Sequence, residues 1–116
     1  MSQPQEVSEV EYRRRIQATL DRVERAFENV DPDLAECEQT LGSLSVRFQD
    51  QTRLILSSQP SVRQLWLAIA SQGMAYHFNY DAATQTWIDD KGRGVELLAF
   101  LNAYFRERIG ADFAIA

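Results

Sequence analysis

Between residues 44 and 88 the chain alternates apolar and polar residues in short runs, and turn-forming residues separate these runs. Such alternation is typical of β-strands that bury one face, because successive side chains point to opposite sides of a sheet. The connections are too short for crossover helices, so we expect an antiparallel meander. A preceding run of small and acidic residues adds a first strand. The predicted strands cover residues 35–39, 44–48, 52–57, 64–70, 75–80 and 85–88.

Amphipathic helices flank the predicted sheet on both sides in the sequence. Ser8 and Glu11 form a capping box, and apolar residues then recur at steps of three and four. Pro32 disfavours helical geometry at Asp31, so we expect the first helix to end there. Residues 95–109 form the second predicted helix.

These elements predict an α+β fold in one domain over residues 1–116. Both helices have an apolar stripe and the strands alternate, so the simplest packing is a two-layer sandwich. The N- and C-terminal helices would pack on one face of a five- to six-stranded antiparallel sheet and leave the other face to solvent. We expect the partly apolar tail, residues 111–116, to fold back on the domain.

The charge distribution points to a specific acidic region. The net charge of −5 argues against nucleic acid as the main partner. Residues 21–38 hold seven acids and two bases, which equals the whole net charge, and the flanking segments are neutral. Helical phase places the acids of the first helix in one stripe, with Arg22 and Arg25 on the far side. Glu36 and Glu38 share one strand face. This predicted acidic ridge consists of Asp21, Glu24, Glu28, Asp31, Asp33, Glu36 and Glu38.

Carboxylates without cationic partners are the ligands that a hard cation prefers. The ridge has neither EF-hand spacing nor a His or Cys cluster, so any metal would bind loosely on an open surface. A basic protein surface is a second use of such a ridge. A solvated helix face is the third interpretation, and charge alone favours it.

The exposed sheet face carries one large aromatic residue. Leu65, Leu67 and Ile69 face the predicted helices, so Trp66 points to the open side. It is either an anchor for a partner or a tryptophan covered by its neighbours or the tail. His77, the only histidine, is expected on the same face as a packed or surface residue.

Other classes of protein are disfavoured. Cys37 is the only cysteine, which excludes an intramolecular disulfide and fits a reducing cytoplasm, and its expected role is a small buried hydrophobe. No apolar run approaches the length of a membrane span, and we expect neither a secretory leader nor a membrane partner. The chain lacks a Ser-His-Asp set and a Gly-rich phosphate loop, so we expect no hydrolase or transferase.

Five segments give the chain a resemblance to the frataxin family, and its bacterial, CyaY-type branch is the closer match. They are Glu36-Cys37-Glu38, Gln64-Leu65-Trp66-Leu67-Ala68, Tyr76-His77-Phe78, Trp87-Ile88 and Val95-Glu96-Leu97-Leu98. The resemblance implies weak binding of Fe²⁺ and Fe³⁺ on the acidic ridge. It also implies binding to the cysteine desulfurase and the scaffold protein of iron–sulfur cluster assembly, in a bacterial cytoplasm. The partner-binding residues that it implies are Gln64, Trp66, His77 and Ser57, the last in place of a common Asn.

The chain also departs from this family. Several members have paired acids where this chain has Glu24-Arg25 and Glu28-Asn29, which thins the ridge. We therefore expect an iron-binding regulator or iron donor, with a metal-free acidic adaptor or a ferroxidase as alternatives. We expect a monomer, or an oligomer that forms with iron.

Overall fold

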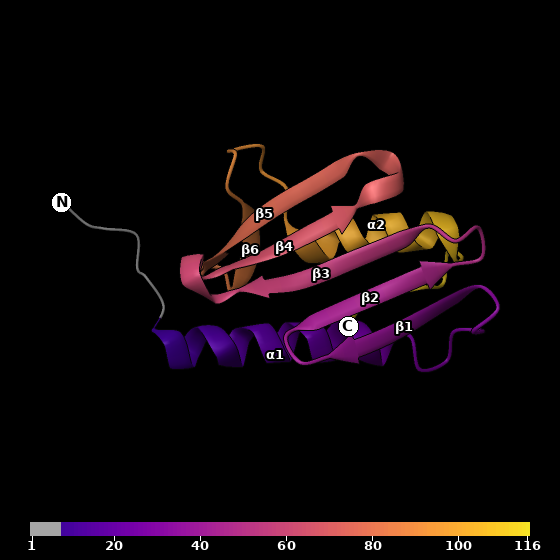
Figure 1. The fold of residues 1–116 in the computed structure, drawn as a ribbon, viewed down its shortest axis with the longest axis horizontal. Coiled ribbons are helices and arrows are strands. Elements are labelled where there is room, and N and C mark those ends of the chain that lie inside the picture. Colours follow the sequence, from indigo (N-terminus) through magenta and orange to yellow (C-terminus); the bar gives the residue numbers. More distant parts are fainter. Residues whose placement is uncertain (1–7) are drawn as a thin grey trace.

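The computed structural model describes residues 8–116, so the part of the predicted domain before Ser8 lies outside the described residues. Six strands form one antiparallel sheet in the order β1-β2-β3-β4-β5-β6, a plain meander (Figure 1). The strands are β1 (Ala35–Thr40), β2 (Ser43–Phe48), β3 (Arg53–Gln59), β4 (Gln64–Ile69), β5 (Met74–Asp81) and β6 (Thr86–Asp89). The helices are α1 (Glu9–Ala26) and α2 (Leu97–Arg108), and short 3₁₀ turns, η1 (Pro60–Val62) and η2 (Ala70–Gln72), border β4.

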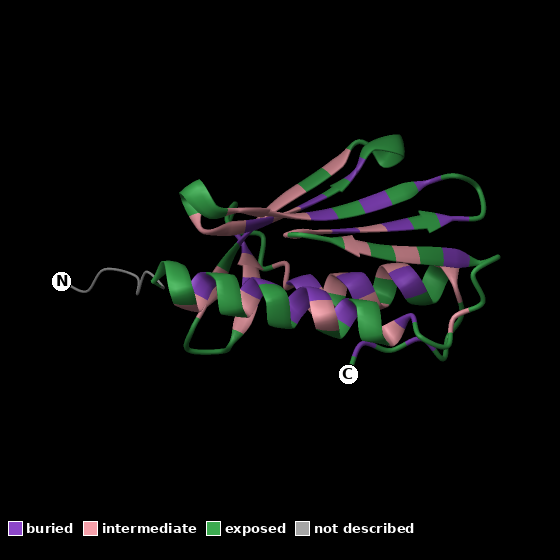
Figure 2. Cartoon of the chain, turned by 60° about the horizontal axis from the view of Figure 1, so that its bottom comes forward, coloured by how far each residue is buried: buried purple, intermediate pink, exposed green. Residues whose placement is uncertain are grey.

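Both helices cover the same face of the sheet, as the alternation predicts (Figure 2). Leu44, Val46, Leu65 and Leu67 are fully or almost fully buried between the two layers. Leu20 and Leu101 close this core from the helix side, also without exposed surface. The predicted α+β two-layer fold is therefore confirmed, with the sheet's second face left open.

The first helix is shorter than its apolar stripe predicts. Ser8 caps it as expected, since its Oγ accepts a hydrogen bond of 3.1 Å from the Glu11 backbone. The helix ends at Ala26, and the chain continues through tight turns in which Val30 N donates to Phe27 O. The expected end at Asp31 is therefore wrong. Phe27 and Val30 continue the three-residue apolar spacing of the helix, but the backbone there forms i→i+3 hydrogen bonds, which belong to tighter turns than an α-helix.

The second helix begins two residues later than predicted. Glu96 is its N-cap, and its carboxylate accepts hydrogen bonds from Leu98 N at 2.9 Å and Ala99 N at 3.0 Å. Glu96 also forms an isolated bridge with Ile88. The carboxylate stabilises the positive end of the helix, and the bridge fixes the loop from β6 to α2.

The C-terminal tail folds back over the helix layer, as predicted. Phe113 is buried with its ring centroid 5.0 Å from that of Phe27 and 5.2 Å from that of Phe105. Arg106 Nε donates to the Phe113 carbonyl at 2.8 Å. Arg22 Nε donates to the Ala116 backbone oxygen at the same distance. The tail thus completes the core on the side away from the sheet.

Candidate functional site

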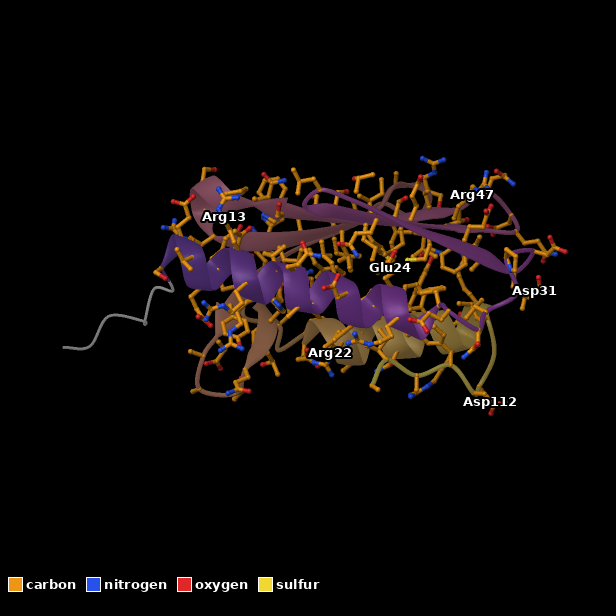
Figure 3. All side chains as sticks on the ribbon, turned by 90° about the horizontal axis from the view of Figure 1, so that it is seen from below. Arg13, Arg22, Glu24, Asp31, Arg47 and Asp112 are labelled. Atoms are coloured by element: carbon orange, nitrogen blue, oxygen red, sulfur yellow. The ribbon has the colours of Figure 1, made fainter. Side chains whose placement is uncertain are left out.

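The acidic ridge wraps around β1, the first strand of the sheet. Glu24 lies on the side of α1 next to β1, and Arg22 projects from the opposite side of the helix (Figure 3). The predicted separation of the acids from this arginine is therefore confirmed. Glu36 and Glu38 are exposed on the open face of β1, the face away from the helices. Asp31 lies in the turns between α1 and β1, so the ridge continues from helix to strand.

Two glutamines occupy part of the ridge. Gln39 Nε2 donates hydrogen bonds to Glu24 Oε1 at 2.8 Å and to Asp21 Oδ1 at 3.3 Å. Gln17 Nε2 donates to Asp21 Oδ1 and to Gln39 Oε1, both at 2.8 Å. We call Gln17 and Gln39 the amide pair. Gln17 lies one helical turn before Asp21, so helical spacing offered a signal for this contact, whereas only the fold brings Gln39 to α1.

Glu36 is the third ridge acid with a side-chain contact, and its partner is a cation. Arg47 on β2 lies opposite Glu36 in the antiparallel register, and the two side chains form an ion pair. The expectation that the ridge acids lack cationic partners is therefore wrong for Glu36, because strand register alone decides this pairing. Among residues 8–116 the ridge acids without a side-chain ion pair or amide contact are Glu28, Asp31, Asp33 and Glu38.

The ridge is an open surface rather than a closed metal site. Within the described residues no three His, Cys, Asp or Glu side chains are arranged to hold a metal ion. A shallow groove between α1 and β1 is lined by Glu24, Glu28 and Glu36, and Cys37 forms part of its wall. Burial, and to a lesser extent the Glu24 charge, raises the pKa of Cys37 to about 12. The thiol therefore stays protonated at neutral pH and is a poor metal ligand.

The open sheet face presents a line of side chains across three strands. Ser57 on β3 pairs with Trp66 on β4, and Trp66 pairs with His77 on β5. The indole and imidazole rings stack with centroids 4.1 Å apart and planes inclined by 14°. Both residues are half-buried and keep exposed surface. The placement of Trp66 and His77 on this face is confirmed, and His77, not the tail, covers part of the indole.

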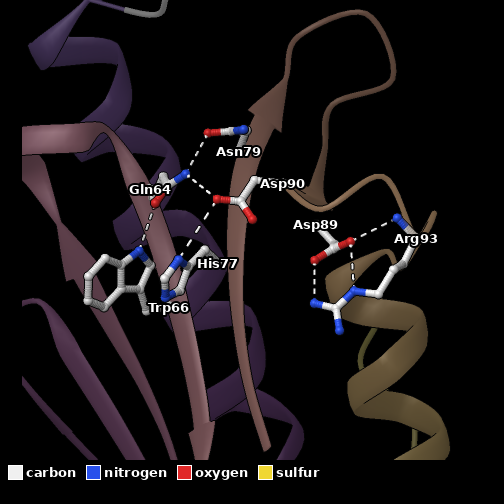
Figure 4. A network of polar contacts seen from close by, with 7 residues as sticks. All are labelled: Gln64, Trp66, His77, Asn79, Asp89, Asp90 and Arg93. Atoms are coloured by element: carbon white, nitrogen blue, oxygen red, sulfur yellow. Dashed lines mark hydrogen bonds and ion pairs between the residues drawn. The ribbon is translucent and has the colours of Figure 1, made fainter.

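A polar network holds this aromatic pair (Figure 4). Trp66 Nε1 donates to Gln64 Oε1 at 2.8 Å. Gln64 Nε2 donates to Asn79 Oδ1 at 3.1 Å and to Asp90 Oδ2 at 3.0 Å. Sequence reasoning missed Asp90 because it lies in a loop that has no periodic pattern. The amide side chain of Gln64 is therefore fixed by contacts from two strands and the loop after β6.

The neighbouring residue Asp89 anchors that loop from the other side. Its carboxylate has no exposed surface and pairs with Arg93 at 2.8 Å. The same carboxylate accepts a hydrogen bond from Arg93 N at 3.0 Å. These contacts lower the pKa of Asp89 to about 2. The Arg93 guanidinium lies 4.5 Å from the centre of the Tyr76 ring, so the loop is packed as well as hydrogen-bonded.

Tyr12 fixes the backbone of Gln64, whose side chain belongs to this polar network. Its hydroxyl donates to the Gln64 carbonyl at 2.6 Å and accepts from Gln59 N at 3.0 Å. The hydroxyl thereby joins the end of β3 to the start of β4 around η1. α1 thus sets the backbone position of Gln64 and, through the strand, that of Trp66.

In the described part of the chain no helix combines the length and hydrophobicity needed to cross a membrane.

The fold and the ridge together define an α+β domain with an acidic edge strand and a tryptophan on its open sheet face. Residues 5–111 match the model of the frataxin-like domain, and the chain belongs to this family. The iron–sulfur cluster assembly protein CyaY of Pseudomonas fluorescens is 34% identical over 107 residues, which cover 92% of this chain and 94% of the relative. CyaY of Pseudomonas aeruginosa is 40% identical over 106 residues, or 91% and 94% of the two chains.

Solved structures support the same fold. The frataxin from Psychromonas ingrahamii aligns with a TM-score of 0.76 and 24% identity, over 90% of this chain and 97% of its own. Trimeric yeast frataxin complexed with ferrous iron aligns with a TM-score of 0.60 and 19% identity, over 94% and 92% of the two chains. The family resemblance read from the sequence is confirmed.

Proposed function

We propose that this chain is an iron-binding protein of iron–sulfur cluster assembly that regulates, or supplies iron to, the cysteine desulfurase–scaffold complex. The observation that carries the proposal is the acidic ridge around β1, whose segment, residues 21–38, holds the entire net charge and whose acids are mostly exposed to solvent. The names of the CyaY relatives and the ferrous complex of the yeast relative support this assignment.

Iron binding at such a ridge would be weak and exchangeable. Carboxylate oxygens are suitable ligands for a hard cation, but an open set leaves most coordination positions to water. The amide pair and Arg47 already contact three of the seven acids. We therefore expect iron to bind first around Glu28, Asp31 and Asp33, in the turns that connect α1 to β1.

An anaerobic Fe²⁺ titration followed by ¹⁵N NMR tests this assignment. Broadening is expected in residues 24–38 and should decrease in a variant that combines Glu28→Gln and Asp31→Asn. Asp112→Asn is the matched control, because Asp112 is an exposed acid in the C-terminal tail. Unchanged broadening in the double variant, or none in the unmodified protein, would contradict iron binding on the ridge.

The second part of the proposal concerns the protein partners. A negative ridge at one edge of the sheet and a half-buried tryptophan on its open face suit a partner that has a basic surface and an apolar pocket. We expect Trp66→Ala to weaken binding to the desulfurase–scaffold complex, and added salt to weaken the contribution of the ridge. Desulfurase turnover and cluster formation would be measured with and without the protein. No change in either rate would contradict the proposal.

A metal-free acidic adaptor is the alternative, and the contacts that already occupy Asp21, Glu24 and Glu36 favour it. The Fe²⁺ titration separates the two functions. Ferroxidase activity is not part of the proposal, because the described ridge offers no enclosed site for iron and oxygen. We expect oxygen uptake with Fe²⁺ to match that of the buffer.

The proposal includes a cytoplasmic protein that is monomeric without iron. A single half-buried thiol suits a reducing compartment. The yeast relative described as trimeric shows that this fold also occurs in an oligomer. Sedimentation velocity with and without Fe²⁺ measures the oligomeric state directly.

A further inference from the structure

A second group of metal-ligating side chains lies on the open sheet face, away from the acidic ridge. His77 and Asn79 project from β5, and Asp90 extends from the loop after β6 (Figure 4). The ridge belongs to β1, four strands from β5 in the sheet, which is about 19 Å at the usual strand spacing. The two groups therefore cannot share one ion.

The contact between His77 and Asp90 is incomplete. His77 Nδ1 and Asp90 Oδ2 face each other at 3.8 Å, which is too long for a hydrogen bond. Within residues 8–116 the carboxylate has this imidazole as its only ion-pair partner and an amide hydrogen bond from Gln64 at 3.0 Å. The side chains keep 39% and 23% of their surface exposed, so solvent ions reach them.

Coordination geometry fits this gap. Two ligand atoms bonded to one ion at about 2.1 Å lie roughly 3.0 to 3.4 Å apart in octahedral or tetrahedral sites. A shift of less than about 1 Å in Asp90 would bring both atoms into that range. Asn79 Oδ1 lies 3.1 Å from the same Gln64 nitrogen that contacts Asp90, so a third ligand atom is adjacent.

We propose that His77 Nδ1, Asp90 and the Asn79 amide oxygen form a weak site for a borderline divalent cation such as Co²⁺, Zn²⁺ or Fe²⁺. An imidazole nitrogen favours these ions over Mg²⁺, whereas the carboxylates of the ridge favour hard cations. The Gln64 amide nitrogen, which now lies between Asp90 and Asn79, moves aside when the ion binds. Water completes the coordination.

The stacked indole provides a direct readout. A paramagnetic ion on His77 lies next to Trp66, so it quenches the fluorescence of that tryptophan. Trp87 is buried on the other side of the sheet, with its indole bonded to Thr19. A Trp66→Phe variant assigns the signal, because the remaining tryptophan is expected to respond little to Co²⁺.

The experiment titrates the apoprotein with Co²⁺ to about 1 mM, which corresponds to weak binding. We expect saturable quenching with Co²⁺ and none with Mg²⁺. Asp90→Asn removes the charged ligand and leaves the ring stack intact, and His77→Gln removes the nitrogen ligand. Each variant should weaken Co²⁺ binding at least about tenfold, or about 1.4 kcal/mol. Asp81→Asn is the matched control, because Asp81 is an acid on β5, the strand that also carries His77.

The controls separate this site from the ridge. The Glu28→Gln and Asp31→Asn double variant should retain the Trp66 quenching, although it loses the iron-dependent broadening expected at the ridge. Loss of the Trp66 quenching in that double variant would overturn the site. The absence of quenching in the unmodified protein would also overturn it, and so would Co²⁺ affinities of Asp90→Asn and His77→Gln that equal that of the unmodified protein. Circular dichroism confirms that each variant is folded.

Discussion

Trp87 Nε1 on β6 donates a buried hydrogen bond of 2.9 Å to Oγ1 of Thr19 on α1. The two residues are almost completely buried, at 2% and 9% exposure. The contact joins the last strand to the first helix, which are far apart in the sequence. It therefore holds the helix layer against β6, the strand that ends at Asp89 and leads into the loop with Asp90.

Replacement of Thr19 by Val should destabilise the protein. Valine has nearly the same shape but offers no acceptor, so the Trp87 N–H would be buried without a partner. That cost is about 1 to 3 kcal/mol in free energy of unfolding. Urea denaturation measures it, with Thr19→Ser as the control that keeps the hydroxyl. A loss below about 0.5 kcal/mol would show that water or another acceptor replaces Thr19.

Asp89 should make stability sensitive to strong acid. Its pKa is about 2 in the folded protein, because Arg93 stabilises the carboxylate, and about 3.9 in an unfolded chain. The folded state is therefore favoured above about pH 4, and this contribution disappears as pH falls toward about 2. Asp89→Asn should lower stability at pH 5 and reduce its change between pH 4 and 2.

Urea midpoints of both proteins across that pH range measure this difference. Asp112→Asn is the control, because that exposed acid lies in the C-terminal tail and not in the loop that holds Arg93. Equal pH slopes in wild type and Asp89→Asn would contradict the assigned role of the Asp89–Arg93 pair.

Truncation of Phe113 should detach the tail. The ring is 7% exposed and packs edge-on against Phe105. Phe113→Ala removes a buried aromatic side chain, which costs about 3 kcal/mol in free energy of unfolding. Thermal or urea unfolding measures the loss, and Asp112→Ala should change stability by less than about 0.5 kcal/mol. Equal effects of the two substitutions would mean that the tail does not contribute to the core.

Replacement of Gln39 by Ala should strengthen iron binding at the ridge. Gln39 now occupies one carboxylate oxygen each of Asp21 and Glu24 through hydrogen bonds from its amide N–H groups. Their release should raise affinity about twofold, since a surface contact of this kind contributes about 0.5 kcal/mol. Isothermal titration with Fe²⁺ under anaerobic conditions measures it, and Gln72→Ala on η2 is the control. Weaker binding would instead identify Gln39 as an iron ligand.

Periodicity predicted most of the fold. The alternation in β2 and β4 is regular enough to give both the strands and the direction of Trp66, because one face of the sheet is buried and the other is not. The outward direction of His77 followed from the same alternation, whereas its position beside Trp66 depends on the register of β4 and β5. The end of α1 was missed because the turns after Ala26 keep an apolar spacing that resembles one more helical turn.

The contacts of the candidate site were harder to predict. The ion pair of Glu36 with Arg47 depends on strand register, and the bond from Gln39 to Glu24 depends on how α1 packs beside β1. Asp90 has no pattern around it that points to Gln64. Charge composition located the ridge but not the neighbours that contact its carboxylates, because those neighbours come from other elements of the fold.

β1 lies at the edge of the sheet, so within residues 8–116 no strand pairs with the outer side of its backbone. Exposed edge strands associate with one another unless charges keep them apart, and Glu36 and Glu38 place such charges on this strand. The other edge, β6, is partly covered by the bridge to Glu96. We therefore expect the ridge to act as an electrostatic barrier to self-assembly. Cations that neutralise it would lower this barrier, so ion loading and polymerisation should rise together.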